Sequence, residues 1–227
     1  MYLLDSDAAR KLCQYLLLDE FAASLGCGLQ EFAVLPQLKF QLATQNESKA
    51  LKKLGSSEAV LLAQALVAAA AEIDLSPEAA NNLLQLSPPD IDSGEAVLFA
   101  ALSQRDQDML ISGDKRAYVA LSGIEGHSLV EELWPQLICL EEAILLILGC
   151  FPFELVSDRI RARNDVDMSL RIVFGSSTAN TQETVIAALE SYLGDLARLT
   201  GSKYRPLAEK QVPGGKPAKK DQPHRPP

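Results

Sequence analysis

The feature that most constrains the fold is a short apolar run that ends in an acid and passes directly into a helix pattern. The chain begins with YLLD (2–5), and residues 7–25 then repeat apolar side chains three and four positions apart. DMLISGD (108–114) repeats the arrangement and leads into the helical pattern of DKRAYVALSGI. A strand that leads straight into a helix is how many α/β units begin. The sequence therefore predicts an α/β fold with a short parallel sheet.

Other segments carry helix or strand patterns of their own. Strands are expected at 31–35 and 138–140, and helices at 36–44, 47–54, 57–72, 78–86, 93–106, 141–149, 153–164 and 181–201. Residues 168–174 fit either a strand or a helix end. From residue 205 onward, six prolines, several lysines and two adjacent glycines indicate a disordered basic tail. We therefore expect an α/β domain over 1–150, a helical extension packed on it over 151–204, and a tail over 205–227.

Composition and charge exclude several classes of protein. The apolar share of 48% excludes wholesale disorder, and no apolar run reaches the roughly 20 residues of a membrane-spanning helix. The N-terminus has no basic region of the kind that starts a signal peptide, so we expect a cytoplasmic protein. The net charge is −9, and residues 1–204 alone carry 15 basic and 28 acidic residues. Bulk electrostatics will not draw nucleic acid to such a body.

Three acids occupy similar positions in the pattern. Asp5 closes the first strand, Asp114 closes the run DMLISG, and Glu95 begins a helix after a loop. The carboxyl ends of parallel strands share one edge of the sheet, where ligands bind, so these side chains are expected to converge. Crowded carboxylates repel one another unless a hard cation bridges them, which predicts Mg²⁺ or Mn²⁺. Such ions support hydrolysis of phosphodiesters.

At these residues the chain resembles the PIN-like domain family, in particular a bacterial group related to toxin–antitoxin ribonucleases. LLDSDAARKL is similar to the family's first strand and helix, and DSGEAVLFAAL followed by DMLISGDKRAYVAL is similar to its later helix and strand. The resemblance covers about residues 1–145. It implies a three-layer α/β/α fold with extra C-terminal helices, and catalytic acids at Asp5, Glu95 and Asp114. Asp92 joins them as a candidate metal ligand.

The sequence also departs from the family. A further acid is expected early in the helix after the second strand, where VLPQLKFQL places Gln41 instead. Each candidate acid also has a plainer interpretation as a helix N-cap or as the partner in a capping box. Lys115, Arg116 and Arg10 could approach phosphates, but each is equally typical of a solvated helix face. Ser112 could orient a carboxylate or a water molecule.

Two functions are compatible with these observations. The first is a metal-dependent nuclease that hydrolyses RNA, and the second is an inactive PIN-like domain that acts as a binding or interaction module. RNA, a protein partner or a second copy of the chain are the partners to be considered, and no membrane is expected. An accidental resemblance in a largely helical protein is the third alternative.

Overall fold

Five short strands form one parallel sheet in the computed structural model, which describes residues 1–74, 91–105 and 107–209. The strands are β1 (Tyr2–Leu4), β2 (Phe32–Val34), β3 (Ala71–Glu72), β4 (Met109–Ser112) and β5 (Leu137–Cys139). Their order is β3-β2-β1-β4-β5, and every neighbouring pair is parallel. The strands that follow β1 in the sequence, β2 and β3, therefore lie on one side of it, and the later strands β4 and β5 lie on its other side. This reversal between β1 and β4 is the topological switch point of the sheet, beside which open α/β folds bind ligands.

Helices connect and follow these strands. The helices of the first half are α1 (Ser6–Gln14), α2 (Leu18–Ser24), α3 (Leu38–Gln41), α4 (Glu47–Leu54), α5 (Ser57–Ala69) and α7 (Ser93–Leu102). Those of the second half are α8 (Lys115–Ser122), α9 (Ser128–Leu133), α10 (Leu140–Cys150), α11 (Phe153–Ala162), α12 (Met168–Phe174) and α13 (Gln182–Leu199). Short 3₁₀ turns occur at η1 (Leu29–Glu31), η2 (Trp134–Gln136) and η3 (Leu207–Glu209).

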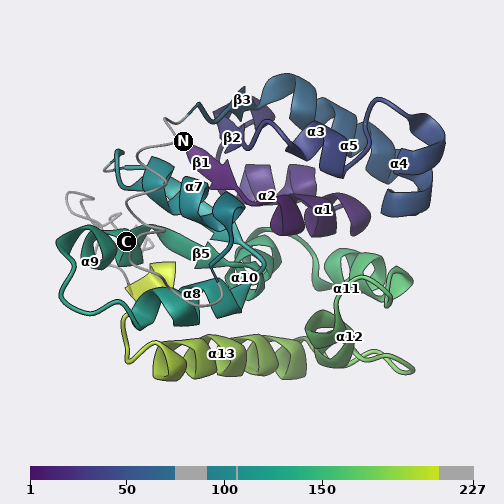
Figure 1. Cartoon of the computed structure of the whole chain (residues 1–227). Helices are drawn as coiled ribbons and strands as arrows, with labels where there is room; N and C mark the ends of the chain where they lie inside the picture. The colour runs from purple at the N-terminus through teal and green to yellow at the C-terminus, as the bar shows by residue number, and fades with distance from the viewer. Residues whose placement is uncertain (75–90, 106, 210–227) are drawn as a thin grey trace, which may run out of the picture.

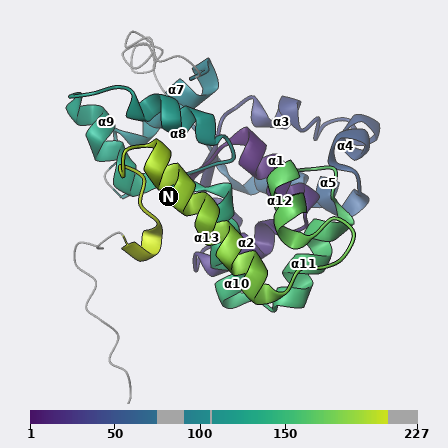
Figure 2. The ribbon, with the colours of Figure 1, turned by 90° about the horizontal axis from the view of Figure 1, so that it is seen from below.

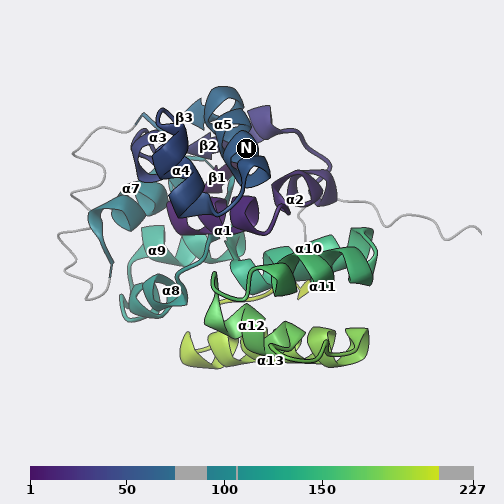
Figure 3. The same cartoon turned by 90° about the vertical axis from the view of Figure 1, so that its right-hand side faces the viewer.

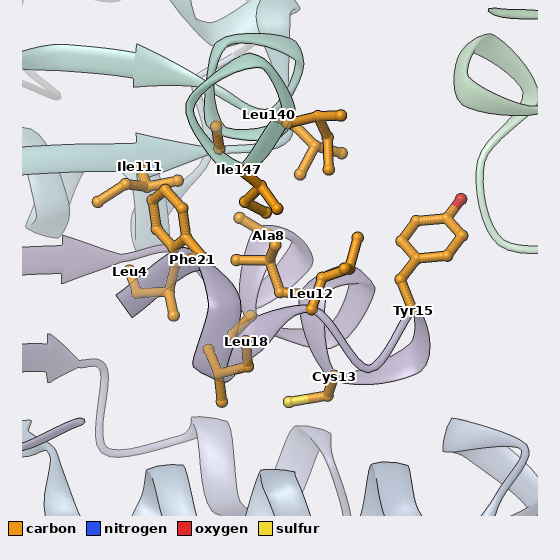
Figure 4. Packing of buried hydrophobic residues seen from close by; sticks show 14 of the residues in the cluster. Leu4, Ala8, Leu12, Cys13, Tyr15, Leu18, Phe21, Ile111, Leu140 and Ile147 are labelled. Carbon is orange, nitrogen blue, oxygen red and sulfur yellow. The ribbon is translucent and has the colours of Figure 1, made fainter. Parts of the chain in front are cut away.

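The strands alternate their side chains between two hydrophobic cores, one on each face of the sheet. Leu4 and Ile111 point into the core with α1, α2, α4, α5 and α10, whereas Leu3 and Leu110 point into the core with α7, α8 and α9. This alternation follows from the two-residue period of a strand. Figure 4 shows side chains from β1, β4, α1, α2 and α10 gathered at the first face. The predicted three-layer α/β/α fold is confirmed.

The helices after residue 150 share the first of these cores. Val156 from α11, Phe174 from α12 and Val185 from α13 belong to the same buried cluster as Leu4. Figures 1 and 3 show α12 and α13 on the side of the molecule away from α3, α4 and α5, whereas Arg163 at the end of α11 donates to the carbonyl of Leu54 in α4. In Figure 2, α13 runs diagonally across the view, past α10 and α12. Its C-terminal half, with Leu193 and Leu196, packs into the second core.

Several sequence expectations need correction. Residues 7–25 form two helices, because Leu16 adopts a left-handed backbone conformation with φ 56° between α1 and α2. The two-residue strand β3 was expected to be part of a helix, and α9 was not expected at all. The segment 168–174 is the helix α12. The expected helix over 78–86 lies almost wholly outside the described residues.

The predicted start of the tail at residue 205 is too early. The backbone N–H of Leu207 donates to the carboxylate of Glu142, and residues 207–209 form η3. The hydroxyl of Tyr204, which is fully buried, donates to the other oxygen of Glu142. The chain up to residue 209 is therefore fastened to α10. The rest of the predicted tail, 210–227, lies outside the described residues.

Candidate active site

The candidate acids lie beside the switch point of the sheet. Asp5 follows β1 directly, and Asp114 lies two residues beyond the end of β4, the neighbouring strand. The backbone N–H of Asp5 donates to the carbonyl of Ile111 in β4 at 2.9 Å, which holds the two strand ends together. Asp92 and Glu95 begin α7, which leads into β4. The fold thus brings the four acids predicted from the sequence to one region.

All four acids also cap helices. Asp5 caps α1 by accepting from the N–H of Asp7 at 3.3 Å, and Asp114 caps α8 by accepting from the N–H of Arg116 at 2.9 Å. Asp92 and Glu95 form the reciprocal capping box of α7, with hydrogen bonds of 2.8 and 2.9 Å. Each acid therefore has the capping role that was its alternative interpretation. For Asp5, Asp92 and Glu95, capping uses one oxygen of the carboxylate and leaves the other able to meet a ligand.

Ser112 connects two of the acids at the end of β4. Its hydroxyl donates to Asp5 at 3.4 Å and accepts from the backbone N–H of Asp114 at 3.1 Å. The side chain is nearly fully buried, so its position is fixed by packing as well as by these bonds. Ser112 therefore contacts the carboxylate of Asp5, one of the two partners, a carboxylate or a water molecule, considered for it from the sequence.

The acids are close enough to shift one another's ionisation. Partial burial raises the pKa of Glu95 to about 7, and the negative charges of Asp92, Asp114 and Asp5 add to the rise. Burial also raises the pKa of Asp5, together with the charges of Asp7 and Asp92, while backbone N–H donors oppose it. A carboxyl with a pKa near 7 can accept or release a proton at neutral pH. Such shifts are typical of functional sites.

The ionisation of Asp114 differs from that of Asp5 and Glu95, because the positively charged side chain of Arg116 binds its carboxylate. The Arg116 guanidinium grips both of its oxygens, with Nη2 at 2.7 Å from Oδ2 and Nε at 3.1 Å from Oδ1. These hydrogen bonds hold the pKa of Asp114 below its ordinary value. Asp114 is therefore ionised at neutral pH, whereas Glu95, with a pKa raised to about 7, gains and loses its proton in that range.

Three residues of this region were missed by the sequence reasoning. Asp7 lies against the turn after β4, where a Cβ at Gly113 would collide with its carboxylate. Lys11, 11% exposed, lies 2.7 Å from both Asp7 and Asp167, and its charge also lowers the pKa of Asp114. The D-x-D spacing of Asp5 and Asp7, and the i, i+4 spacing of Asp7 and Lys11, could have indicated both residues.

The third missed residue is Gln37, which lies near the start of α7, whereas the sequence drew attention to Gln41. Gln41 is exposed at the end of α3, and its carbonyl accepts from the Lys53 ammonium. The Gln37 amide instead lies 4.0 Å from the position of a Cβ at Gly94, next to the start of α7. The amide at this edge of the site therefore comes from the turn after β2, before α3 begins.

The donor atoms suit a hard divalent cation in their chemistry. Asp5, Asp7, Asp92, Glu95 and Asp114 offer only carboxylate oxygens, which Mg²⁺ and Mn²⁺ prefer. Within residues 1–74, 91–105 and 107–209, no three acidic, histidine or cysteine side chains already lie in the arrangement of a metal centre. A cation at Asp114 would compete with the Arg116 guanidinium for the carboxylate oxygens.

The raised pKa of Glu95 predicts a pH-dependent stability. Because the folded-state pKa of about 7 exceeds the ordinary value of 4.5, stability from this group is full below pH 4.5 and is lost as the pH rises through 7. Glu95→Gln keeps a capping acceptor without the charge. We expect it to raise the free energy of unfolding by about 1 kcal/mol at pH 8, a value discounted for solvent screening, and by much less at pH 5.

Urea unfolding at the two pH values measures this difference. Glu190→Gln, at an exposed position on α13, is the matched control and should change stability little at either pH. An equal effect of Glu95→Gln at pH 5 and pH 8 would contradict the proposed ionisation of Glu95.

Comparison with known proteins identified no relative of this chain. No family model, curated protein or solved structure matches the chain. A search of the helices in the described part of the chain found none with the length and apolar character needed to cross a bilayer. The case for function therefore depends on the acids gathered where β1 and β4 end.

Proposed function

We propose that this protein is a PIN-like, metal-dependent nuclease that hydrolyses RNA phosphodiester bonds at the end of β1 and β4. The observation that carries the proposal is the gathering of Asp5, Glu95 and Asp114 beside the switch point, where their charges shift one another's pKa. The sequence resemblance to PIN-like proteins supports the same residues. A cytoplasmic location goes with this proposal.

Asp5, Glu95 and Asp114 are the residues that would hold Mg²⁺ or Mn²⁺, with Asp92 as a further ligand. A bound divalent ion would supply positive charge against the negative charge that develops on the phosphate during hydrolysis. Ser112 keeps Asp5 in place through its hydroxyl, and β1 and β4 fix the spacing of Asp5 and Asp114. The strands therefore supply a rigid base for the acids.

Glu95 must lose a proton before it can hold a cation, because burial and the neighbouring acids raise its pKa to about 7 in the metal-free protein. Metal affinity is therefore expected to increase between pH 6 and pH 8. This dependence places the optimum of activity at or above pH 7.

The second candidate function is an interaction module without hydrolysis. Two observations favour it: Asp114 is occupied by Arg116, and residues 1–204 carry 13 more negative than positive charges. Such a body repels RNA except where local cations gather. A protein partner or a second copy of the chain would then be the ligand.

Cleavage of a mixed-sequence RNA in Mn²⁺ separates the two functions. The nuclease proposal expects cleavage by the purified protein, abolished by EDTA and restored by added Mn²⁺. Cleavage that persists in EDTA would contradict a role for the metal. The absence of cleavage with any divalent cation would favour the interaction module.

A further inference from the structure

A cavity of about 490 Å³ lies where the segment after α13 meets η2. Its lining comes from the end of α9, from η2 and from the segment that follows α13, and includes Glu131, Trp134, Pro135, Ser202, Lys203 and Arg205. The volume is within the range of small-molecule sites in proteins. Of the described residues that line the cavity, none is an acid of the candidate active site, so the cavity is a separate feature of the fold.

Trp134 contributes an unpaired hydrogen-bond donor to this lining. The residue is 4% exposed, and its indole Nε1 is buried with no acceptor among the residues that the structure describes. An indole N–H can only donate, and a buried donor in a native protein normally has a partner in the protein, in water or in a ligand. The unpaired Nε1 of a side chain that lines a cavity therefore points to a ligand with an acceptor oxygen.

Arg205 is the base whose charge is available at the cavity. Its side chain is exposed, and no hydrogen bond or ion pair holds its guanidinium within the described part of the chain. By contrast, the Lys203 ammonium lies 2.7 Å from a carboxylate oxygen of Glu131, so these two charges offset each other. The other acid of the lining, Glu209, is exposed to water. Arg205 can therefore bind an anion, and the planar guanidinium matches the geometry of a carboxylate.

The wall formed by the segment after α13 has a fixed conformation. Ser202 has a left-handed backbone with φ 64°, which is uncommon for a residue other than glycine, and its N–H donates to the carbonyl of Ala197 at 2.7 Å. Tyr204 is fully buried, and its N–H donates to the hydroxyl of Thr200 at 3.1 Å. Arg205 follows directly. The cavity is thus already formed without a ligand, as most small-molecule sites are.

We propose that this cavity binds a small organic carboxylate, which accepts hydrogen bonds from the Trp134 indole N–H and from the Arg205 guanidinium. The apolar part of the ligand lies against Pro135 and the indole ring. A carboxylate is favoured over a phosphate because Glu131 and Glu209 repel a single negative charge less than a double one. This inference is independent of the proposed nuclease activity.

Fluorescence titration of the full chain tests the site, because Trp134 is the only tryptophan in the sequence. Sodium benzoate is the probe, since it joins a carboxylate to an apolar ring. We expect a saturable change in emission at millimolar benzoate. Benzamide has the same ring without the charge and should bind on the order of tenfold more weakly. In two-dimensional proton–nitrogen NMR spectra, benzoate should move the indole N–H resonance downfield, as a new hydrogen bond to a carboxylate requires.

Arg205→Gln should weaken benzoate binding about tenfold, because a charge-assisted hydrogen bond is lost at an exposed position. Arg198→Gln removes an exposed arginine paired with Asp195 on α13 and is the control, with benzoate affinity unchanged. The absence of a saturable change, or equal affinity for benzoate and benzamide, would overturn the proposal. Inorganic phosphate that binds as tightly as benzoate would indicate a general anion site and contradict the choice of an organic carboxylate. Unchanged benzoate affinity in Arg205→Gln would contradict the role of Arg205.

Discussion

Asp5→Asn is expected to lower the rate of RNA cleavage on the order of 100- to 1,000-fold. Asparagine caps a helix as well as aspartate does, so the start of α1 should survive the change. It also keeps an oxygen that can accept from Ser112. What it removes is the negative charge opposite the proposed cation, at the rigid end of β1. The loss should therefore fall on activity while the fold is retained.

A single-turnover cleavage assay in Mn²⁺, together with circular dichroism and urea unfolding, measures both sides of this prediction. Asp19→Asn, which neutralises an exposed acid in the first turn of α2, is the matched control and should retain full activity. Full activity in Asp5→Asn would remove this residue from the site. Loss of activity accompanied by unfolding would indicate only a structural role.

Glu142→Ala is expected to lower the free energy of unfolding by about 3 kcal/mol. The Glu142 carboxylate is 3% exposed and accepts from the Tyr204 hydroxyl and from the backbone N–H of Leu207. Alanine would leave both donors without this acceptor, and the Tyr204 hydroxyl is too deeply buried to reach water. The segment after α13 should then detach from α10. Tyr204 also accepts from the N–H of Cys139 at the end of β5, so the sheet edge would be affected as well.

Urea unfolding and amide hydrogen exchange at residues 200–209 measure this effect. Glu190→Ala on the exposed face of α13 is the control, because it removes a carboxylate at a surface position and should change stability by less than about 0.5 kcal/mol. Equal stability of Glu142→Ala and Glu190→Ala would show that the C-terminal segment does not depend on Glu142.

The parts of the fold that could be predicted from sequence are those with local signals. YLL and MLIS are apolar runs that end next to helix caps, and both became strands of the parallel sheet with Asp5 and Asp114 at their ends. The capping box of Asp92 and Glu95 is likewise a pattern over four residues. The order of β1 and β4 as neighbours follows from no local pattern, yet it is what brings these acids together.

Features that depend on distant contacts were not predictable. β3 has two exposed residues, and only its pairing with β2 makes it a strand. The Leu16 backbone turns left-handed in a run whose spacing continues a helix, and the turn precedes α2, which packs against α10. Lys11 forms ion pairs with Asp7 and with Asp167, and Asp167 lies 156 positions after Lys11 in the sequence. No rule of spacing along the sequence joins such residues.

Some chemical features of the site were also predictable from local sequence, and others depend on the fold. Residue types and strand ends indicated which acids lie beside the switch point, but the pKa of about 7 at Glu95 arises from burial and from three other acids that the fold supplies. Arg116 is typical of a solvated helix face in sequence, and only the structure shows its two hydrogen bonds to Asp114. The positions of the acids were thus predictable from the sequence, whereas their ionisation and their pairing with Arg116 were not.

Isothermal titration of the protein with Mn²⁺ tests the central claim most directly, with Asp5→Asn and Asp114→Asn combined in one variant. Both asparagines retain helix capping, so the comparison is between two folded proteins that differ in two carboxylates. The account predicts saturable Mn²⁺ binding by the unmodified protein and none by the double variant at the same concentrations. Binding of equal affinity in both proteins would contradict it, as would a failure of the unmodified protein to bind Mn²⁺.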